Sequence, residues 1–351
     1  MKWYKLIFLL IIFSSCQKDK IDTKEPRITL ENISIKEIDI KGKFLHRIDF
    51  VDTLNGYGTN DHEIYKTVDG GHNWELVYSG ETDLEIIALD MFDIENIFIT
   101  ARILNNDPNI ISNFTHYLIK SNNEGKTFEK VKIPIDHDKY NEPRHLKCIS
   151  ADKIFISGRG TLIHSDNGGV TWKEENTIET PISYNKVSFD GYGNGYCGSK
   201  DGMIMYSNDF GESWRSIQSN VGYWIHDIYT FNDNLYFRSF SNLYTGTFDQ
   251  LSNLKKTHIG NSEENADPFN FNLLHIYDED IILDIGYVFT PYASVPESIL
   301  YISNDGGASW SMNTINNYLW FYSPVSIDKN NIMAITSTGD TQLILHVKIS
   351  E

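Results

Sequence analysis

Several features are scarce in this 351-residue sequence, and each scarcity narrows the class of protein. Basic residues are few: 30 Lys and Arg stand against 48 Asp and Glu, a net charge of −18. Without a basic stripe to neutralise phosphates, a nucleic-acid partner is not expected. The N-terminal apolar run, Leu6–Phe13, is less than half of the about 20 residues that a transmembrane helix needs. Proline is also rare, and 9 Pro with 24 Gly fit the turns of a β-rich domain better than a disordered linker.

Signatures of cofactor chemistry are missing as well. The sequence has no glycine-rich phosphate loop, and its 11 His residues show no metal-ligand spacing, so we expect no cofactor and no metal. Of the three Cys residues, Cys148 and Cys197 fall on strands of neighbouring repeats. A disulfide between them stays open in an oxidising compartment, but two separate buried thiols are favoured.

What the sequence does contain is one short segment repeated five times. The shared pattern is Ser/Thr, any residue, Asp/Asn, any residue, Gly, any residue, Ser/Thr/Asn and an aromatic residue. The copies are Thr67–Trp74, Ser121–Phe128, Ser165–Trp172, Ser207–Trp214 and Ser303–Trp310. Five copies in register predict a repeat protein.

The residue types of this segment predict a tight turn between two strands. An Asp or Asn side chain accepts hydrogen bonds from nearby backbone amides, and the Gly supplies a positive φ. The aromatic residue then buries a large apolar face. Because each copy offers one carboxylate or amide where a calcium loop needs several converging oxygens, we interpret the segments as structural. Their key residues are Asp69, Gly71, Trp74, Asn123, Gly125, Phe128, Asn167, Gly169, Trp172, Asp209, Gly211, Trp214, Asp305, Gly307 and Trp310.

The segment resembles the Asp-box (BNR) repeat of sialidases, sortilin-type receptors and related β-propellers. Two repeats carry a longer motif, in which the box is preceded by Asn55–Gly58 in one repeat and by Asn194–Gly198 in the other. This motif resembles the photosystem II stability/assembly-factor-like propellers, which are seven-bladed. The resemblance spans roughly residues 28 to 350 and implies a fold more than a function.

We therefore expect an all-β fold, a seven-bladed β-propeller of four-stranded antiparallel blades. In blade five the box has decayed, since Thr247-Phe248-Asp249 stands where it is due. Blade seven has three strands at most before the chain stops, and the alternating segment Ile28–Ile40 is the natural fourth strand. Such pairing closes the ring and removes an exposed sheet edge.

The first residues are expected to be an export signal. Lys2 and Lys5 precede the apolar run, and small residues lead to Cys16. The block resembles a bacterial lipoprotein signal, with Gln17-Lys18-Asp19 similar to lipoproteins of Bacteroidetes; a plain secretory signal stays open. We expect a signal peptide at 1–15, a lipid on Cys16, a tether at 16–27 and the propeller at 28–351. The resemblance implies an outer-membrane, lipid-anchored protein, exposed at the surface or else facing the periplasm.

The ligand surface is expected opposite the boxes, where the longest loops fall: 102–113, 133–144, 260–270 and 286–297. Basic side chains near the ends of second strands can hold an anionic group. Local pairing of each Arg, and neutral drift of the loops, are the competing interpretations. The candidate ligand-face residues are Arg102, Arg159, Lys200, Arg238, Tyr140, Arg144, Tyr287 and Tyr292.

No catalytic set can be assigned to this chain. Sialidases carry an Arg-Ile-Pro segment, and the nearest approach, Arg27-Ile28-Thr29, lacks the Pro. We therefore expect a non-enzymatic, monomeric propeller that binds a protein partner at the cell envelope. The alternative is a glycan-binding or sialidase-like glycoside-hydrolase propeller, for which Glu142, Asp201 and Asp107 are the candidate carboxylates.

Overall fold

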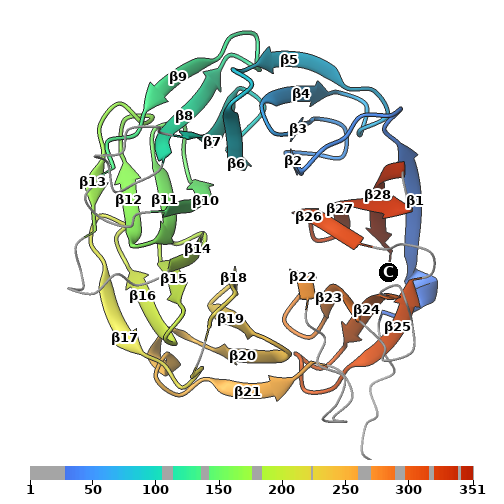
Figure 1. The fold of residues 1–351 in the computed structure, drawn as a ribbon. Helices are drawn as coiled ribbons and strands as arrows, with labels where there is room; N and C mark the ends of the chain where they lie inside the picture. Colours follow the sequence, from blue (N-terminus) through green and yellow to red (C-terminus); the bar gives the residue numbers. More distant parts are fainter. Residues whose placement is uncertain are drawn as a thin grey trace, which may run out of the picture.

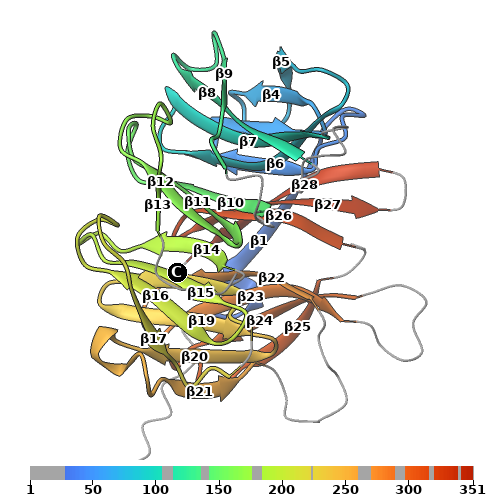
Figure 2. The ribbon, with the colours of Figure 1, turned by 60° about the vertical axis from the view of Figure 1, so that its left-hand side comes forward.

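The computed structural model describes residues 28–104, 114–135, 142–175, 184–222, 224–259, 270–288, 297–315, 320–338 and 341–350. Its strands form seven antiparallel four-stranded sheets arranged in a ring (Figure 1). Figure 2, turned by 60°, shows the successive blades side by side around that ring. The predicted seven-bladed propeller is confirmed. The predicted signal peptide, Cys16 and the tether lie outside the described residues.

In blades one to six the four strands follow one another outward from the centre of the ring in chain order, and in blade seven the N-terminal strand β1 takes the outer position (Figure 1). Blades one to three contain β2 (Arg47–Phe50), β3 (Gly56–Thr59), β4 (Glu63–Thr67), β5 (Glu75–Ser79); β6 (Leu84–Met91), β7 (Asn96–Leu104), β8 (Phe114–Asn122), β9 (Glu129–Lys132); and β10 (Glu142–Cys148), β11 (Ile154–Arg159), β12 (Thr161–Ser165), β13 (Lys173–Glu174). Blades four to six contain β14 (Tyr184–Phe189), β15 (Gly195–Ser199), β16 (Met203–Ser207), β17 (Arg215–Gln218); β18 (Asp227–Phe231), β19 (Asn234–Ser239), β20 (Asn242–Gly246), β21 (Lys255–His258); and β22 (Asn270–Ile276), β23 (Ile282–Val288), β24 (Glu297–Ser303), β25 (Ser311–Ile315). Blade seven contains β26 (Trp320–Asp328), β27 (Asn331–Thr338), β28 (Thr341–Ile349) and β1 (Ile33–Asp39).

The ring is closed by the N-terminal strand, as the sequence predicts. β1 pairs antiparallel with β28, from Ile33 opposite Ile349 to Asp39 opposite Leu343. The segment before β1 is tied to blade six, because the backbone amide of Ile28 donates to Asn304 Oδ1 at 3.0 Å. The two ends of the described chain thus complete one sheet, which leaves no open edge at the junction.

The core lies between blades. Among the described residues, buried apolar side chains form seven clusters, one between each pair of neighbouring blades. Second strands are buried on both faces, as β3 and β15 show at every position, whereas the outer strand β17 is mostly exposed. Neighbouring blades therefore stabilise each other through the hydrophobic effect.

The repeated segments form one hydrogen-bonded turn in five blades. In blade four, Ser207 Oγ donates to Asp209 Oδ1 at 2.7 Å and accepts from the amide of Gly211 at 2.8 Å. Asp209 also accepts from the amide of Ser213 at 3.0 Å. The same three bonds recur in the other four segments. Burial raises the pKa of Asp209, but hydrogen bonds from Ser213 and Ser207 outweigh it and lower the pKa to about 2.

The glycine of each segment also allows neighbouring blades to approach closely. Gly211 has a φ of 78°, and a Cβ there would lie 2.4 Å from the Phe155 ring of blade three. A Cβ on Gly169 would lie 2.3 Å from Leu118 of blade two, and one on Gly307 2.7 Å from Leu243 of blade five. Glycine is therefore required twice, by the backbone conformation and by the contact with the preceding blade.

Candidate functional site

The repeated segments define one face of the ring. The amides of Gly70, Gly168 and Gly306 donate to carbonyls in the turn between the first and second strands of their own blade, at 2.8–2.9 Å. We call this end of the blades the box face. Because neighbouring strands are antiparallel, the starts of first strands and the turns between second and third strands lie on the opposite face. The predicted ligand surface belongs to that opposite face.

A cavity of about 610 Å³ lies at the centre of the ring. Its walls come from the first strand of every blade (Figure 1). On a chain of net charge −18, four cationic side chains face two carboxylates in this lining. The cations are Arg47, Arg144, Lys147 and Lys186, and the carboxylates are Asp49 and Asp90. The cavity is therefore locally cationic, and we take it as the candidate binding site.

The two carboxylates link neighbouring blades through hydrogen bonds. Asp49 Oδ2 accepts from the amide of Met91 at 2.7 Å, and Asp90 Oδ2 accepts from the amide of Cys148 at 2.6 Å. Lys147 Nζ lies 3.1 Å from Asp90 Oδ1. Burial, helped by Asp90, raises the pKa of Asp49 to about 7, against the opposing effect of Lys147. The raised pKa favours the neutral form of Asp49, which reduces the negative charge of the lining.

A second charged group extends from the cavity into the wall of blades five and six. Lys186, whose side chain is 55% exposed, lies 3.2 Å from Asp227. Arg238 lies between Asp227 at 2.5 Å and Asp284 at 3.4 Å. Burial raises the pKa of Asp284 to about 8, whereas Asp227 is held at about 2 because Lys186 and Arg238 outweigh its own burial. Asp227 thus carries the negative charge that both cations share.

Arg238 is a correction to the sequence prediction. It was placed on the ligand face because it ends a second strand, but its side chain is 4% exposed and paired on both sides. Its guanidinium belongs to the wall between blades and is not presented to solvent. For this residue, local pairing was the right interpretation.

The other predicted cations have different surroundings. Arg102 pairs with Glu85 at 2.8 and 2.9 Å and lies 4.0 Å from the Phe114 ring, so it also has a local partner. Arg159 is exposed at the end of β11, and Lys200 Nζ lies 5.0 Å from the Trp224 ring. Arg144 is exposed at the start of β10 and lines the cavity. Of these four, Arg144 is the one that lines the central cavity.

Much of the predicted ligand surface lies outside the described residues. This holds for Tyr140, Tyr292, Asp107 and most of the four long loops, and the side chains of Glu142 and Tyr287 are not described either. Asp201 is exposed in the turn between β15 and β16. The carboxylate pair that the structure does bring together, Asp49 and Asp90, was not among the sequence candidates. The available signal was a polar residue in each apolar first strand.

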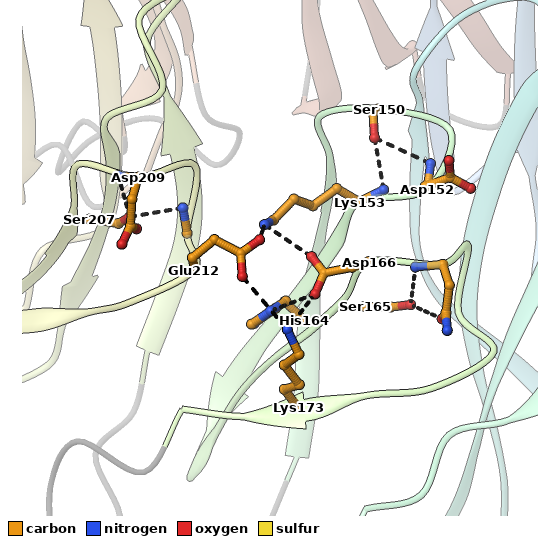
Figure 3. Close-up of polar contacts among 12 residues, drawn as sticks. Ser150, Asp152, Lys153, His164, Ser165, Asp166, Lys173, Ser207, Asp209 and Glu212 are labelled. Carbon is orange, nitrogen blue, oxygen red and sulfur yellow. Dashed lines mark hydrogen bonds and ion pairs between the residues drawn. The ribbon is translucent and has the colours of Figure 1, made fainter.

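A separate ionisable cluster joins blades three and four (Figure 3). His164, Asp166 and Glu212 offer ligand atoms within 4.8 Å of one another. Asp166, however, is paired with Lys153 at 3.0 Å and Lys173 at 2.7 Å, and Glu212 is paired with Lys153 as well. A metal ion would have to displace ammonium groups already held by these carboxylates, so we interpret the cluster as an ion-pair bridge between blades.

The two described cysteines form no disulfide bond. Cys148 and Cys197 are both buried, in β10 and β15, which agrees with the favoured interpretation of two separate thiols. In the part of the chain that the structure describes, we found no helix with the length and apolar character of a membrane span.

No model of a known protein family matches this sequence, and no curated protein matches it. Solved structures resemble it closely in shape. YCF48 bound to a D1 peptide matches with a TM-score of 0.64 and 14% identity, over 93% of this chain and 98% of that chain. YCF48 from Cyanidioschyzon merolae gives a TM-score of 0.60 and 14% identity, over 90% and 98%.

A carbohydrate-active enzyme also resembles this chain. The GH74 xyloglucanase from Xanthomonas campestris has a TM-score of 0.62 and 15% identity, and the match covers 87% of this chain but 52% of the enzyme. This chain therefore spans about half the length of that enzyme. At such identities these likenesses show the propeller fold alone.

Proposed function

We propose that this protein is a non-enzymatic binding protein that holds a protein partner on the face opposite the boxes, acting as a monomer. The observation that carries the proposal is the central cavity, where four cations face two carboxylates on an otherwise acidic chain. Cationic side chains in a concave site favour acidic segments of a partner, and they also steer its approach.

The use of the cavity carboxylates supports binding over hydrolysis. Asp49 and Asp90 accept backbone hydrogen bonds from the next blade, and Asp90 is also paired with Lys147. Side chains held in this way stabilise the ring. The likeness to YCF48 bound to a D1 peptide adds support, since that propeller holds a peptide.

The experiment is a peptide-display selection against residues 21 to 351, followed by affinity measurements on the enriched peptides. We expect Arg144→Glu, at the cavity, to weaken binding at least tenfold. The matched control is Lys126→Glu in the box of blade two, a 68% exposed cation, which should leave affinity unchanged. Selection of no peptide, or equal affinity for both variants, would contradict the proposal.

We further propose that the protein is a lipoprotein of the outer membrane, anchored through Cys16 and exposed at the surface or facing the periplasm. The basic, apolar and small-residue blocks before Cys16 support this. Metabolic labelling with a radioactive fatty acid should mark the wild type and leave Cys16→Ser unlabelled. An unlabelled wild type that is still exported would indicate a plain secretory signal.

The repeated segments are also proposed to be Asp boxes of the BNR type, placing the chain beside the sialidase, sortilin and assembly-factor propellers. The three recurring hydrogen bonds within each segment support that assignment.

The alternative function is glycan binding or glycoside hydrolysis. One observation favours it: Asp49, with a pKa raised to about 7, lies near Asp90, and glycosidases need a protonated acid beside a second carboxylate. Incubation with xyloglucan and with sialosides tests this. Product that appears with the wild type and disappears with Asp49→Asn would establish the enzyme and overturn the binding proposal.

A further inference from the structure

Three ring side chains form a row on the face opposite the boxes, at the inner end of blade five. The rings of Trp224 and His226 stack with centroids 5.8 Å apart and an interplanar angle of 17°. The Phe240 ring meets His226 edge-on at 5.0 Å. Lys200, from the neighbouring turn of blade four, places its ammonium 5.0 Å from the Trp224 ring. We call these four side chains the aromatic row.

The aromatic row is exposed. Trp224 is 40% and Phe240 49% exposed, although both are large apolar side chains that folding would normally bury. Packing in the core therefore explains only the buried part of these two side chains. Inter-blade packing, the structural explanation for aromatics at blade junctions, does not cover the exposed half of each ring.

The backbone at both residues is strained. Trp224 has a φ of 44° and Phe240 a φ of 52°, in the left-handed region that bulky residues avoid. The turns between second and third strands in blades three and four place Gly160 and Gly202 in this region, with φ of 65° and 72°. Blade five instead carries Phe240 in its turn. Strain of this kind persists only where the surrounding structure imposes it, and it is concentrated at active and ligand-binding sites.

We propose that the aromatic row is a docking site for an extended peptide segment of a protein partner, with an apolar ring or branched side chain and a carboxylate two or three residues away. The inference rests on the proposed binding function and gives its partner a chemical signature. The apolar side chain packs on Phe240 and His226, and the carboxylate pairs with Lys200. An extended chain rises about 3.3 Å per residue, so such a spacing can reach along stacked rings.

A peptide fits this site better than a saccharide. Sugar recognition needs polar side chains around the aromatic platform to hold the hydroxyl groups. Beside the row, Ser239 is 3% and Ser241 9% exposed, so their hydroxyls are buried. Lys200 and Asp201 are the exposed ionisable groups of the neighbouring turn. Of these two groups, Lys200 has its ammonium over the Trp224 ring, where it can pair with a carboxylate of a peptide whose apolar side chain packs on the exposed rings.

The test uses a fluorescein-labelled octapeptide of Gly and Ser that carries one Phe and, two residues on, one Glu. Its affinity for residues 21 to 351 is measured by fluorescence anisotropy. We expect Phe240→Gly to weaken binding at least fivefold and Lys200→Gln about threefold. Replacing Phe by Ser in the peptide should abolish binding, and replacing Glu by Gln should reproduce the Lys200→Gln loss.

Phe210→Gly is the matched control. Phe210 is also an exposed Phe, at 54%, with a φ of 58°, but it lies in the box of blade four on the other face. Its removal should not change the affinity. Glycine suits the backbone at both positions, so unfolding midpoints at or above the wild-type value would show that lost binding is not lost folding.

The remaining outcomes separate this inference from the function on which it rests. If the octapeptide does not bind, or binds Phe240→Gly as well as wild type, while display-selected peptides still depend on Arg144, the aromatic row is refuted and the binding function stands. If no peptide binds, both fail. Concentration-dependent dimers lost in Phe240→Gly would assign the row to a second copy, and preferential displacement by an acidic oligosaccharide would assign it to a glycan; either result overturns the peptide proposal.

Discussion

Blades four and five pair their third and fourth strands in the same way, but the loops that connect these strands are built differently. β16 pairs with β17, and β20 with β21, through four residue pairs each. In blade four the connecting loop is the complete box, organised by Asp209. In blade five the loop contains a short 3-10 turn, Phe248–Gln250, and is fixed by buried Leu251 and Leu254. Polar turn chemistry and apolar anchoring are therefore interchangeable solutions for this connection.

We expect the stability of the protein to depend more on the buried leucines of the blade-five loop than on the box of blade four. Leu254 is 3% exposed, and Leu→Ala at a buried site costs roughly 2–5 kcal/mol, so we expect Leu254→Ala to lower the free energy of unfolding by about 3 kcal/mol. Urea unfolding followed by tryptophan fluorescence measures this. Leu76→Ala, at a 47% exposed leucine of β5, is the control and should cost less than about 0.5 kcal/mol. Equal losses would show that the blade-five loop is not anchored by its leucines.

Substitution in the box of blade four should have the next largest effect on stability. Asp209→Ala removes charged hydrogen bonds to Ser207 and Ser213, each of the kind worth about 1.5–3 kcal/mol when buried. Because this carboxylate is only half-buried, we expect a loss of about 2 kcal/mol in all. Asp249→Ala, in the corresponding loop of blade five, should change stability by less than about 0.5 kcal/mol. If both substitutions cost the same, the box of blade four is dispensable.

Acid should affect blade four through Asp209. Its folded pKa of about 2 lies below the unfolded value of about 3.9, so its contribution is present above about pH 4 and is lost as pH falls through 2. Asp209→Asn supplies the residue that blades two and three use, Asn123 and Asn167. The stability difference between wild type and Asp209→Asn, below about 1 kcal/mol after solvent screening, should shrink between pH 5 and pH 2. A difference that stays constant over this range would show that Asp209 keeps an ordinary pKa.

The smallest effect is expected at the other end of the same two blades. Blade four has Gly202 in its turn between second and third strands, whereas blade five has Phe240 with a φ of 52°. Relief of this strain in Phe240→Gly should raise the unfolding free energy by at most about 1 kcal/mol, offset by the flexibility that glycine adds to the unfolded chain. Thermal unfolding at matched concentration measures it. A loss above 1 kcal/mol would mean that the Phe240 ring has a structural role.

The features predicted correctly share a local origin. The three recurring hydrogen bonds of each box join residues two or four positions apart, so the pattern around Asp209 carries its own structure. The decayed box of blade five and the closing strand were visible because the pattern breaks at a known place. The prediction for Arg238 missed both of its partners: Asp227 lies opposite it on the paired strand, 11 residues away, and Asp284 lies 46 residues away in the next blade.

The sequence by itself therefore determined the repeat, the number of blades and the closure of the ring, because short-range hydrogen bonding and alternation encode them. The tertiary structure decided where the charges go. Arg47, Asp90 and Lys186 stand on three different first strands and share one cavity only after the ring has closed. The same holds for the aromatic row, whose Lys200 and Phe240 come from neighbouring blades. Contacts between blades depend on packing across the whole ring, which no local pattern specifies.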